Sequence, residues 1–291
     1  MSVPSVAIII LNWNGWQDTL ECLESLSKTS YPNYQIIVVD NGSTDGSAEK
    51  IEKWSVGKGL PLIVIRAGSN LGFARGNNHG IRYALEKYDP QYILALNNDA
   101  LVEPDCLKIM IDRLEEDKRA GLVGPLILDY QDKKSWLRPL PKRLNLITYI
   151  LFATQLYWVF SRYISIDRSE PSYVYELPGC CLLFRTKALV DIGLFDEQTF
   201  LGWEEFIVAE KLYRLGWRSL FVPQSRIYHK TGQSTSKLPN REKLRRFLQS
   251  ERYYQTAIMR YNIFFRAVIR LVRSLIFFFM TLTRCGKAVP K

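Results

Sequence analysis

The feature that most constrains the fold is a short apolar run, residues 92–96, that leads directly into Asn97, Asn98 and Asp99. Apolar runs of this length are typical of strands buried on both sides in a parallel sheet. In open α/β sheets, ligands bind just outside the carboxyl ends of the strands. We therefore expect these side chains at a ligand-binding edge, where the carboxylate of Asp99 could hold a divalent cation. By itself, the triplet is equally compatible with a polar turn.

Two earlier apolar runs end in polar residues in the same way. Residues 6–11 lead into Asn12, residues 35–40 end at Asp40, and a further apolar run covers residues 62–65. Strands that alternate with helices at this spacing predict an α/β domain with a parallel sheet and right-handed crossovers. The carboxyl ends of such strands lie along one edge, so the polar ends are expected together. Their convergence favours a nucleotide-binding pocket.

The loops after these strands exclude two common classes of nucleotide-binding protein. Residues 41–47 form a turn rich in helix-capping residues, whose backbone N–H groups could face an anion. Residues 70–78 are expected to be a glycine-rich basic loop that leads into a helix. The first strand is followed by no Gly-x-Gly-x-x-Gly fingerprint, and the chain has no Gly-Lys-Ser/Thr phosphate loop. These absences argue against a dehydrogenase and a P-loop NTPase.

Composition limits the partners and the compartment. The 291-residue chain has a net charge of +10, which favours a nucleotide, a nucleic acid or an anionic membrane as partner. Five cysteines without metal-ligand spacing, two of them adjacent, argue against a disulfide framework and for a reducing compartment. No basic segment precedes the first apolar run, so we expect no signal peptide.

Four stretches of the first hundred residues resemble the family-2 glycosyltransferases in order and spacing, most closely their bacterial rhamnosyltransferase-like branch. They are residues 10–15 (ILNWNG), 38–47 (VVDNGSTDGS), 70–78 (NLGFARGNN) and 96–99 (LNND). The resemblance extends over residues 5–235. It implies the GT-A fold, a nucleotide-sugar donor, Mg²⁺ or Mn²⁺ as cofactor, and transfer with inversion at the anomeric carbon.

The resemblance also implies roles for individual residues. Asp40 would contact the base of the donor, Asn12 would lie against the nucleoside, and Arg75 would lie near the donor. Asp99 corresponds to the carboxylate of the family's Asp-x-Asp-type metal site, whose first acidic position is Asn97 here. Metal binding would then depend on one aspartate, the diphosphate and water. The full set expected to bind the nucleotide-sugar is Asn12, Asp40, Asn41, Gly72, Arg75, Asn97, Asn98 and Glu204.

The second half of the chain carries the expected catalytic base. Glu204 and Glu205 resemble a Glu-Asp pair that opens a helix in the family, and Glu205 matches the general base by position. An acceptor hydroxyl is a poor nucleophile until a carboxylate within about 3 Å removes its proton. A helix N-terminus favours the ionised carboxylate, whereas burial and a nearby Asp99 oppose it. His229 resembles a family histidine that reaches the metal or diphosphate, with a structural role as the alternative.

We predict a glycosyltransferase domain over residues 1–235, with a hydrophobic helical insert near residues 140–166. Residues 144–161 are uncharged, which is close to the length of a membrane span. A single crossing there would place Asp99 and Glu205 on opposite sides of the bilayer. We therefore expect a helix in the membrane interface or a helical hairpin against the core.

Residues 236–291 are predicted to form basic amphipathic helices that associate with a membrane. Four arginines fall on one helical face: Arg266, Arg270, Arg273 and Arg284. An apolar stripe follows another face: Phe264, Val268, Leu271, Leu275 and Leu282, with three further phenylalanines at 277–279. This pattern suits an anionic membrane surface, and the arginines make a full span costly. Packing on the enzyme's own core is the alternative.

Together these features predict an inverting, metal-dependent glycosyltransferase that is peripheral to the cytoplasmic face of the cell membrane. Its acceptor would be lipid-linked or a polysaccharide, it would bind no nucleic acid, and it could form an oligomer. Rhamnose from a dTDP donor is preferred by resemblance, with a UDP-sugar as the alternative. The rival classes are a sugar-nucleotide pyrophosphorylase, which would carry an Arg/Lys-bearing glycine-rich loop after the first strand, and a basic nucleic-acid-binding protein.

Overall fold

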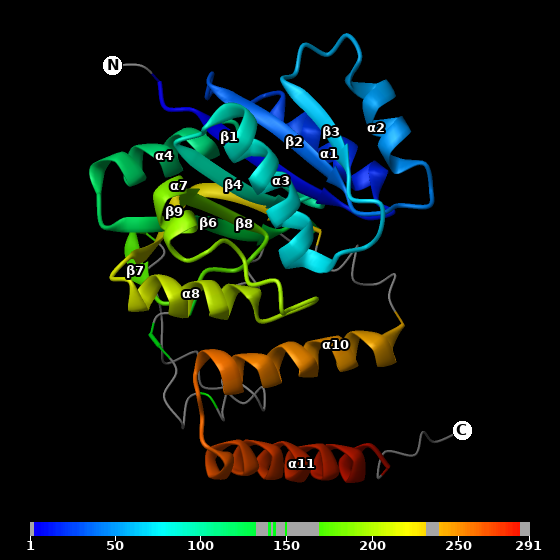
Figure 1. Ribbon diagram of the computed structural model, residues 1–291, viewed down its shortest axis with the longest axis vertical. Helices are drawn as coiled ribbons and strands as arrows, with labels where there is room; N and C mark the ends of the chain where they lie inside the picture. The colour runs from blue at the N-terminus through cyan, green and yellow to red at the C-terminus, as the bar shows by residue number, and fades with distance from the viewer. Residues whose placement is uncertain are drawn as a thin grey trace.

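A mixed sheet of nine strands forms the centre of the computed structural model (Figure 1). The structure describes residues 3–131, 139–140, 142–143, 149, 169–230 and 239–285, with side chains as far as Leu275. The strand order is β3-β2-β1-β4-β8-β6-β9-β5, and β7 pairs with β9. The strands are β1 (Val6–Asn12), β2 (Tyr34–Asp40), β3 (Leu62–Arg66), β4 (Tyr92–Asn97), β5 (Ala100–Val102), β6 (Ala120–Asp129), β7 (Ser172–Val174), β8 (Cys181–Arg185) and β9 (Arg218–His229).

The first four strands form the predicted parallel sheet, and their polar ends converge as expected. Strand β1 lies between β2 and β4, with Asn12 opposite Asp40 and Leu11 opposite Asn97. Beyond β4, the sheet continues through antiparallel β8 into the parallel pair β6 and β9. The α/β class is therefore confirmed, and the carboxyl ends of β1, β2 and β4 share one edge.

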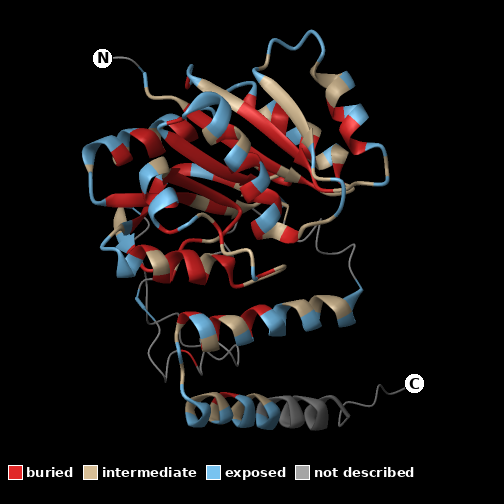
Figure 2. Ribbon diagram, in the orientation of Figure 1, coloured by how far each residue is buried: buried red, intermediate tan, exposed pale blue. Residues whose placement is uncertain are grey.

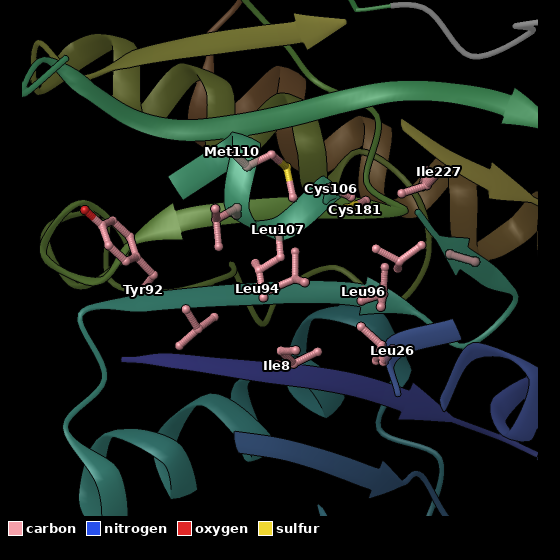
Figure 3. Close-up of a cluster of buried hydrophobic side chains, with 14 of the residues drawn as sticks. Ile8, Leu26, Tyr92, Leu94, Leu96, Cys106, Leu107, Met110, Cys181 and Ile227 are labelled. Carbon is pink, nitrogen blue, oxygen red and sulfur yellow. The ribbon is translucent and has the colours of Figure 1, made fainter. Parts of the chain in front are cut away.

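Helices cover both faces of the sheet, whose strands are the most buried part of the molecule (Figure 2). Alternation along β1 explains the layers, because Ile8 and Ile10 contribute to one core cluster, whereas Ala7 and Ile9 contribute to the other. Figure 3 shows the first cluster, in which Leu107 and Met110 of α4 lie against the sheet. The helices are α1 (Trp16–Leu26), α2 (Ser47–Ser55), α3 (Gly72–Tyr88), α4 (Cys106–Glu116), α7 (Thr186–Asp191) and α8 (Glu204–Arg214).

Two predicted local structures are wrong. Residues 72–78 are the first turns of α3 and not a loop, because Asn41 binds the chain just before them and fixes where the helix starts. The sequence pattern of residues 219–223 and 226–229 predicts two short strands paired with each other, and the structure does not pair them. They belong to the single strand β9, whose two parts both pair with β6. The register shift between these parts places Pro223, which cannot donate a ladder hydrogen bond, in an irregularity of the strand.

The C-terminal helices pack against the start of α8 through an aromatic cluster. They are α10 (Asn240–Tyr253), the π-helical segment η2 (Tyr254–Ile258) and α11 (Ile263–Cys285). The aromatic cluster comprises Tyr149, Trp203, Phe206, Tyr254, Tyr261 and Phe265. Apart from residues 140, 142, 143 and 149, the predicted insert near residues 140–166 lies outside the described residues, as does the side chain of Arg284. Within the described ranges, no helix is both long and apolar enough to cross a membrane.

Candidate active site

The ends of β1, β2 and β4 are joined by a buried hydrogen-bond network. The amide of Asn12 donates to Oδ1 of Asp40 at 3.0 Å and to the hydroxyl of Ser43 at 3.1 Å. The hydroxyl of Thr19, in α1, donates to Oδ1 of Asn12 at 3.0 Å and accepts from the amide of Asn98 at 3.1 Å. All but Ser43 are buried. The structure thus brings together Asn12, Asp40 and Asn98, which the sequence predicts at this edge.

Asn41 and Gly72 lie beside this network and connect it to α3. Oδ1 of Asn41 accepts from the backbone N–H of Leu71 at 3.0 Å, and its amide donates to Oδ1 of Asn70 at 3.2 Å. Gly72 approaches the backbone of Phe200 closely, and the N–H of Phe73 donates to the carbonyl of Phe200 at 3.1 Å. The start of α3 therefore ties the buried hydrogen-bond network to the segment that leads into α8.

Asp99 and His229 form a buried pair beyond β4. Nε2 of His229 lies 3.0 Å from Oδ1 of Asp99 and 3.4 Å from the amide nitrogen of Asn97. The pair is held by the β5–β9 ladder, in which Ala100 is opposite His229. A carboxylate and an imidazole both suit a divalent metal ion. Within the described part of the chain, no group of three or more His, Cys, Asp or Glu side chains is arranged to hold a metal.

Glu204 and Glu205 open α8, as predicted. The chain enters this helix through Gly202 and Trp203, which both have positive φ angles, of 79° and 72°. This conformation is strained for a bulky residue such as Trp203, and such strain is commonly found at functional sites. Glu204 is buried, and among the described residues its Oε1 has no hydrogen-bond partner. Glu205 is partly exposed and lies directly over the backbone of Gly179, where a Cβ atom would come within 2.2 Å of its Oε1.

The charge of Glu205 acts on two other glutamates near this turn. Burial, followed by the charge of Glu205, raises the pKa of Glu204 to about 8 and that of Glu176 to about 8. Burial also raises the pKa of Glu205, while its own backbone N–H and that of Gly179 oppose this shift. Glu204 and Glu176 are therefore largely protonated at neutral pH. Glu205 is the carboxyl group whose negative charge acts on the other two.

Asn97, which lies beside His229, and the predicted base Glu205 both contact the segment of residues 179–181. The N–H of Asn97 donates to the carbonyl of Cys180 at 2.9 Å. Burial raises the pKa of the Cys180 thiol, and the charges of both Asp99 and Glu205 raise it further. Because Asn97 is hydrogen-bonded to Cys180 and Glu205 lies against the neighbouring Gly179, the segments that carry Asp99 and Glu205 meet at one short stretch of chain despite their separation in the sequence.

The structure does not bring Arg75 into this network. Its side chain is exposed, and its Nε donates to the carbonyl of Glu197 at 3.1 Å. Three residues were missed by the sequence reasoning: Thr19, Ser43 and Glu176. The sequence does indicate that Thr19 is buried, because it precedes Cys22, Leu23 and Leu26 on the same side of α1.

The fold and the site define a class. An α/β sheet with amides and carboxylates at its strand ends, a carboxylate–imidazole pair and a carboxylate at a helix start is suited to bind a nucleotide-linked substrate and deprotonate a second one. The family model of Glycosyl transferase family 2 matches residues 7–193. The chain therefore belongs to family 2 of the glycosyltransferases, which disfavours the pyrophosphorylase and the nucleic-acid-binding protein.

Individual proteins agree with this class. The chain is 28% identical over 232 residues to the N-acetylglucosaminyl-diphospho-decaprenol L-rhamnosyltransferase of Mycobacterium tuberculosis, covering 75% of this chain and 73% of that protein.

Two solved structures share the GT-A fold. GalNAc-T7 with UDP, GalNAc and Mn²⁺ has a TM-score of 0.61 and 19% identity over 78% of this chain and 44% of its own. The mannosyltransferase PcManGT from Pyrobaculum calidifontis, with GDP-Man and Mn²⁺, has a TM-score of 0.59 and 16% identity over 100% and 78%. This chain thus spans less than half of the GalNAc-T7 chain.

Proposed function

We propose that this enzyme transfers a sugar, with inversion, from a nucleotide-sugar to a hydroxyl group of a lipid-linked or polysaccharide acceptor in a metal-dependent reaction. The observation that carries the proposal is that the β4 end bearing Asp99 and the side chain of Glu205 both contact residues 179–180, through the Asn97–Cys180 hydrogen bond and the approach of Glu205 to Gly179. A diphosphate held on the Asp99 side would leave its sugar facing the base. The acceptor hydroxyl would then attack the anomeric carbon on the side opposite the leaving diphosphate. This direct displacement inverts the anomeric carbon and needs no enzyme nucleophile.

Asp99 and His229 would hold the metal ion. Their oxygen and nitrogen donors fit Mg²⁺ or Mn²⁺, which commonly complete their coordination with substrate phosphates and water. Two solved structures of similar fold contain Mn²⁺. When bound, the ion would offset the negative charge that develops on the leaving diphosphate. Asn12 and Asp40 would orient the nucleoside, because their side chains are already fixed by the buried network.

Glu205 would act as the general base. It is partly exposed, so an acceptor hydroxyl can approach it, and its position in the first turn of α8 favours the ionised form. Glu204, which is buried beside it, would remain protonated and keep the second negative charge out of the site. The raised pKa of Glu205 increases its basicity near neutral pH, which suits proton removal.

The donor is proposed to be dTDP-rhamnose, with a UDP-sugar as the alternative. The mycobacterial relative is a rhamnosyltransferase by name, and that name also describes a diphospho-decaprenol, which is a lipid-linked acceptor. The GalNAc-T7 structure, which contains UDP, supports the alternative nucleotide. A lipid-linked acceptor would require a peripheral position at the cytoplasmic membrane face, which we also propose.

The proposal can be tested with the purified full-length chain and a panel of nucleotide-sugars, by measuring release of the nucleoside diphosphate. We expect Asp99→Ala and Glu205→Gln each to lower turnover by about 10²–10⁴-fold, because they remove a charge-stabilising group and a base. The matched controls Asp112→Ala and Glu86→Gln, both exposed, should retain activity. Near-normal turnover of either site variant would refute the role of that residue.

A further inference from the structure

Helix α11 contacts the protein with part of its arginine-bearing side and leaves apolar side chains exposed. Ile269 is buried, Phe265 lies in the aromatic cluster, and Arg273 donates to the buried carboxylate of Glu251 at 2.7 Å. The exposed side chains include Ile263 and Phe264, each 75% exposed, Leu271 at 60% and Leu275 at 48%. Surface helices of soluble proteins normally turn their apolar side inward. The exposed stripe of α11 therefore indicates an apolar binding partner.

The surroundings of this stripe are strongly basic. Residues 239–275 contain nine Arg or Lys and two Asp or Glu, so they hold +7 of the chain's net charge of +10. Arg270 is exposed on α11, and Arg241 and Arg245 are exposed on α10. On α10, Leu244, Phe247 and Leu248 are 58%, 41% and 40% exposed. Apolar side chains mixed with arginines match the acyl chains and anionic headgroups of a bilayer surface.

We infer that the exposed stripe of α11, comprising Ile263, Phe264, Leu271 and Leu275, inserts into the interface of an anionic lipid bilayer. The arginines of α10 and α11 contact the lipid headgroups. This inference rests on the peripheral location proposed above and not on the transfer chemistry. It names the helix face that binds and the lipid charge that is required.

Aromatic contacts also tie α11 to the rest of the protein. Phe265 of α11 contacts Tyr149, which stacks on Trp203 at 5.8 Å between ring centroids. Trp203 immediately precedes Glu204 and Glu205. Aromatic contacts therefore connect α11 to the start of α8, and α10 lies between these two helices in Figure 1. Figure 1 shows α11 as the described helix farthest from the sheet.

Flotation of the full-length chain with vesicles tests the inference. The vesicles are made of phosphatidylcholine alone or with phosphatidylglycerol. We expect the wild type to float with the anionic vesicles, and the Phe264→Ser/Leu271→Ser variant to lose at least about tenfold in partitioning, since both side chains leave water on binding. The control variant Val56→Ser/Val190→Ser, which alters exposed apolar residues elsewhere, should float like the wild type. Point variants are used because removing α10 and α11 would uncover Trp203 and Phe206.

Two outcomes would overturn the inference. One is equal flotation of the wild type and the Phe264→Ser/Leu271→Ser variant. The other is a wild-type dimer in sedimentation velocity that this variant loses without any vesicle binding by the wild type, which would make the stripe an interface between two copies. Release of nucleoside diphosphate is measured in the same samples without vesicles. Absence of that activity in the wild type would count against the proposed transfer chemistry. Flotation alone tests the proposed membrane-binding surface.

Discussion

At the scale of single residues, the charge of Glu205 organises its neighbours. The backbone of Gly179 leaves room for the Glu205 side chain, because any Cβ atom there would overlap the carboxylate. Gly179 also supplies an N–H group that stabilises the ionised form. Glu176 and Glu204 respond to that charge by holding their own protons. Keeping Glu176 and Glu204 neutral avoids the cost of several adjacent buried charges.

This arrangement predicts how stability depends on pH. The pKa of Glu176 rises from 4.5 to about 8 on folding, so its contribution to stability is fully present below pH 4.5 and is lost as the pH rises to about 8. Within that window, each carboxyl group whose pKa is raised in this way lowers the free energy of unfolding by about 1.4 kcal/mol per pH unit. Between pH 5 and pH 8, the free energy of unfolding of the Glu176→Gln variant should therefore decrease less than that of the wild type. Urea unfolding at several pH values measures this difference.

The control for this prediction is Glu86→Gln, which alters an exposed carboxyl group whose pKa is lowered by Lys87. The free energy of unfolding of this control variant should depend on pH in the same way as that of the wild type. If the Glu176→Gln and wild-type curves remain parallel from pH 5 to pH 8, Glu176 does not bury a proton in the folded state.

The sequence allowed part of the site to be predicted at this scale. Asn12, Asp40 and Asp99 could be placed because each ends an apolar run, and parallel strands align their ends. Ser43 and Glu176 could not, because their contacts depend on how a turn and an irregular segment fold back onto the strands. The expected proximity of Arg75 to the donor stays a prediction, since in this structure Arg75 bonds to the carbonyl of Glu197.

At the scale of elements, the start of α3 couples the two halves of the site. Asn41 holds the chain before this helix, and Gly72 packs against Phe200, four residues before Glu204. In the structure, Gly72 allows the start of α3 to approach the segment around Phe200 closely. Its predicted role in nucleotide-sugar binding stays a prediction. The sequence could not separate loop from helix here, because glycine and asparagine favour turns unless tertiary contacts fix the helix start.

Gly72→Ala should destabilise the protein by about 2–5 kcal/mol. The φ angle of Gly72 is 80°, which costs an alanine about 1–2 kcal/mol. The added Cβ atom would also lie 2.7 Å from the carbonyl oxygen of Phe200, and such overpacking costs about 1–3 kcal/mol. Turnover should fall as well, because displacement of Phe200 moves the start of α8. Chemical unfolding and the nucleoside diphosphate assay measure both effects.

Gly68→Ala is the matched control, because Gly68 has a φ angle of 76° but no atom within 4 Å of an added Cβ. It shares the conformational cost without the overlap. Equal destabilisation by the two substitutions would show that contact with Phe200 contributes nothing to the folded state.

At the scale of the whole molecule, the C-terminal helices are continuous with the catalytic domain in the described residues. Tyr149, Trp203 and Tyr254 stack together, which joins the predicted insert, the start of α8 and the C-terminal helices into one core. The periodicity of residues 263–275 predicted a helix but not which side would face the protein. That side is decided by a buried carboxylate, Glu251, which is distant in sequence from its partner Arg273.

Loss of this ion pair should detach α11. Glu251 is buried and accepts hydrogen bonds from Tyr149 at 3.1 Å and Gln255 at 3.3 Å, as well as from Arg273. Glu251→Ala leaves the guanidinium of Arg273, which is partly exposed, without its partner. Limited trypsin digestion should then cleave faster after Arg260, an exposed residue in the turn before α11. Glu242→Ala, which removes only the partly exposed pairs of Glu242 with Arg245 and Arg246, should leave the cleavage rate unchanged.

A second variant separates the ion pair from general damage to the core. In Glu251→Ala/Arg273→Leu, the unpaired guanidinium is replaced by an apolar side chain, which removes the cost of a charge without a partner. This double variant should resist trypsin better than Glu251→Ala. If both are cleaved at the same rate, α11 is held by the aromatic cluster alone, and the orientation of its exposed stripe does not depend on the charge of Glu251.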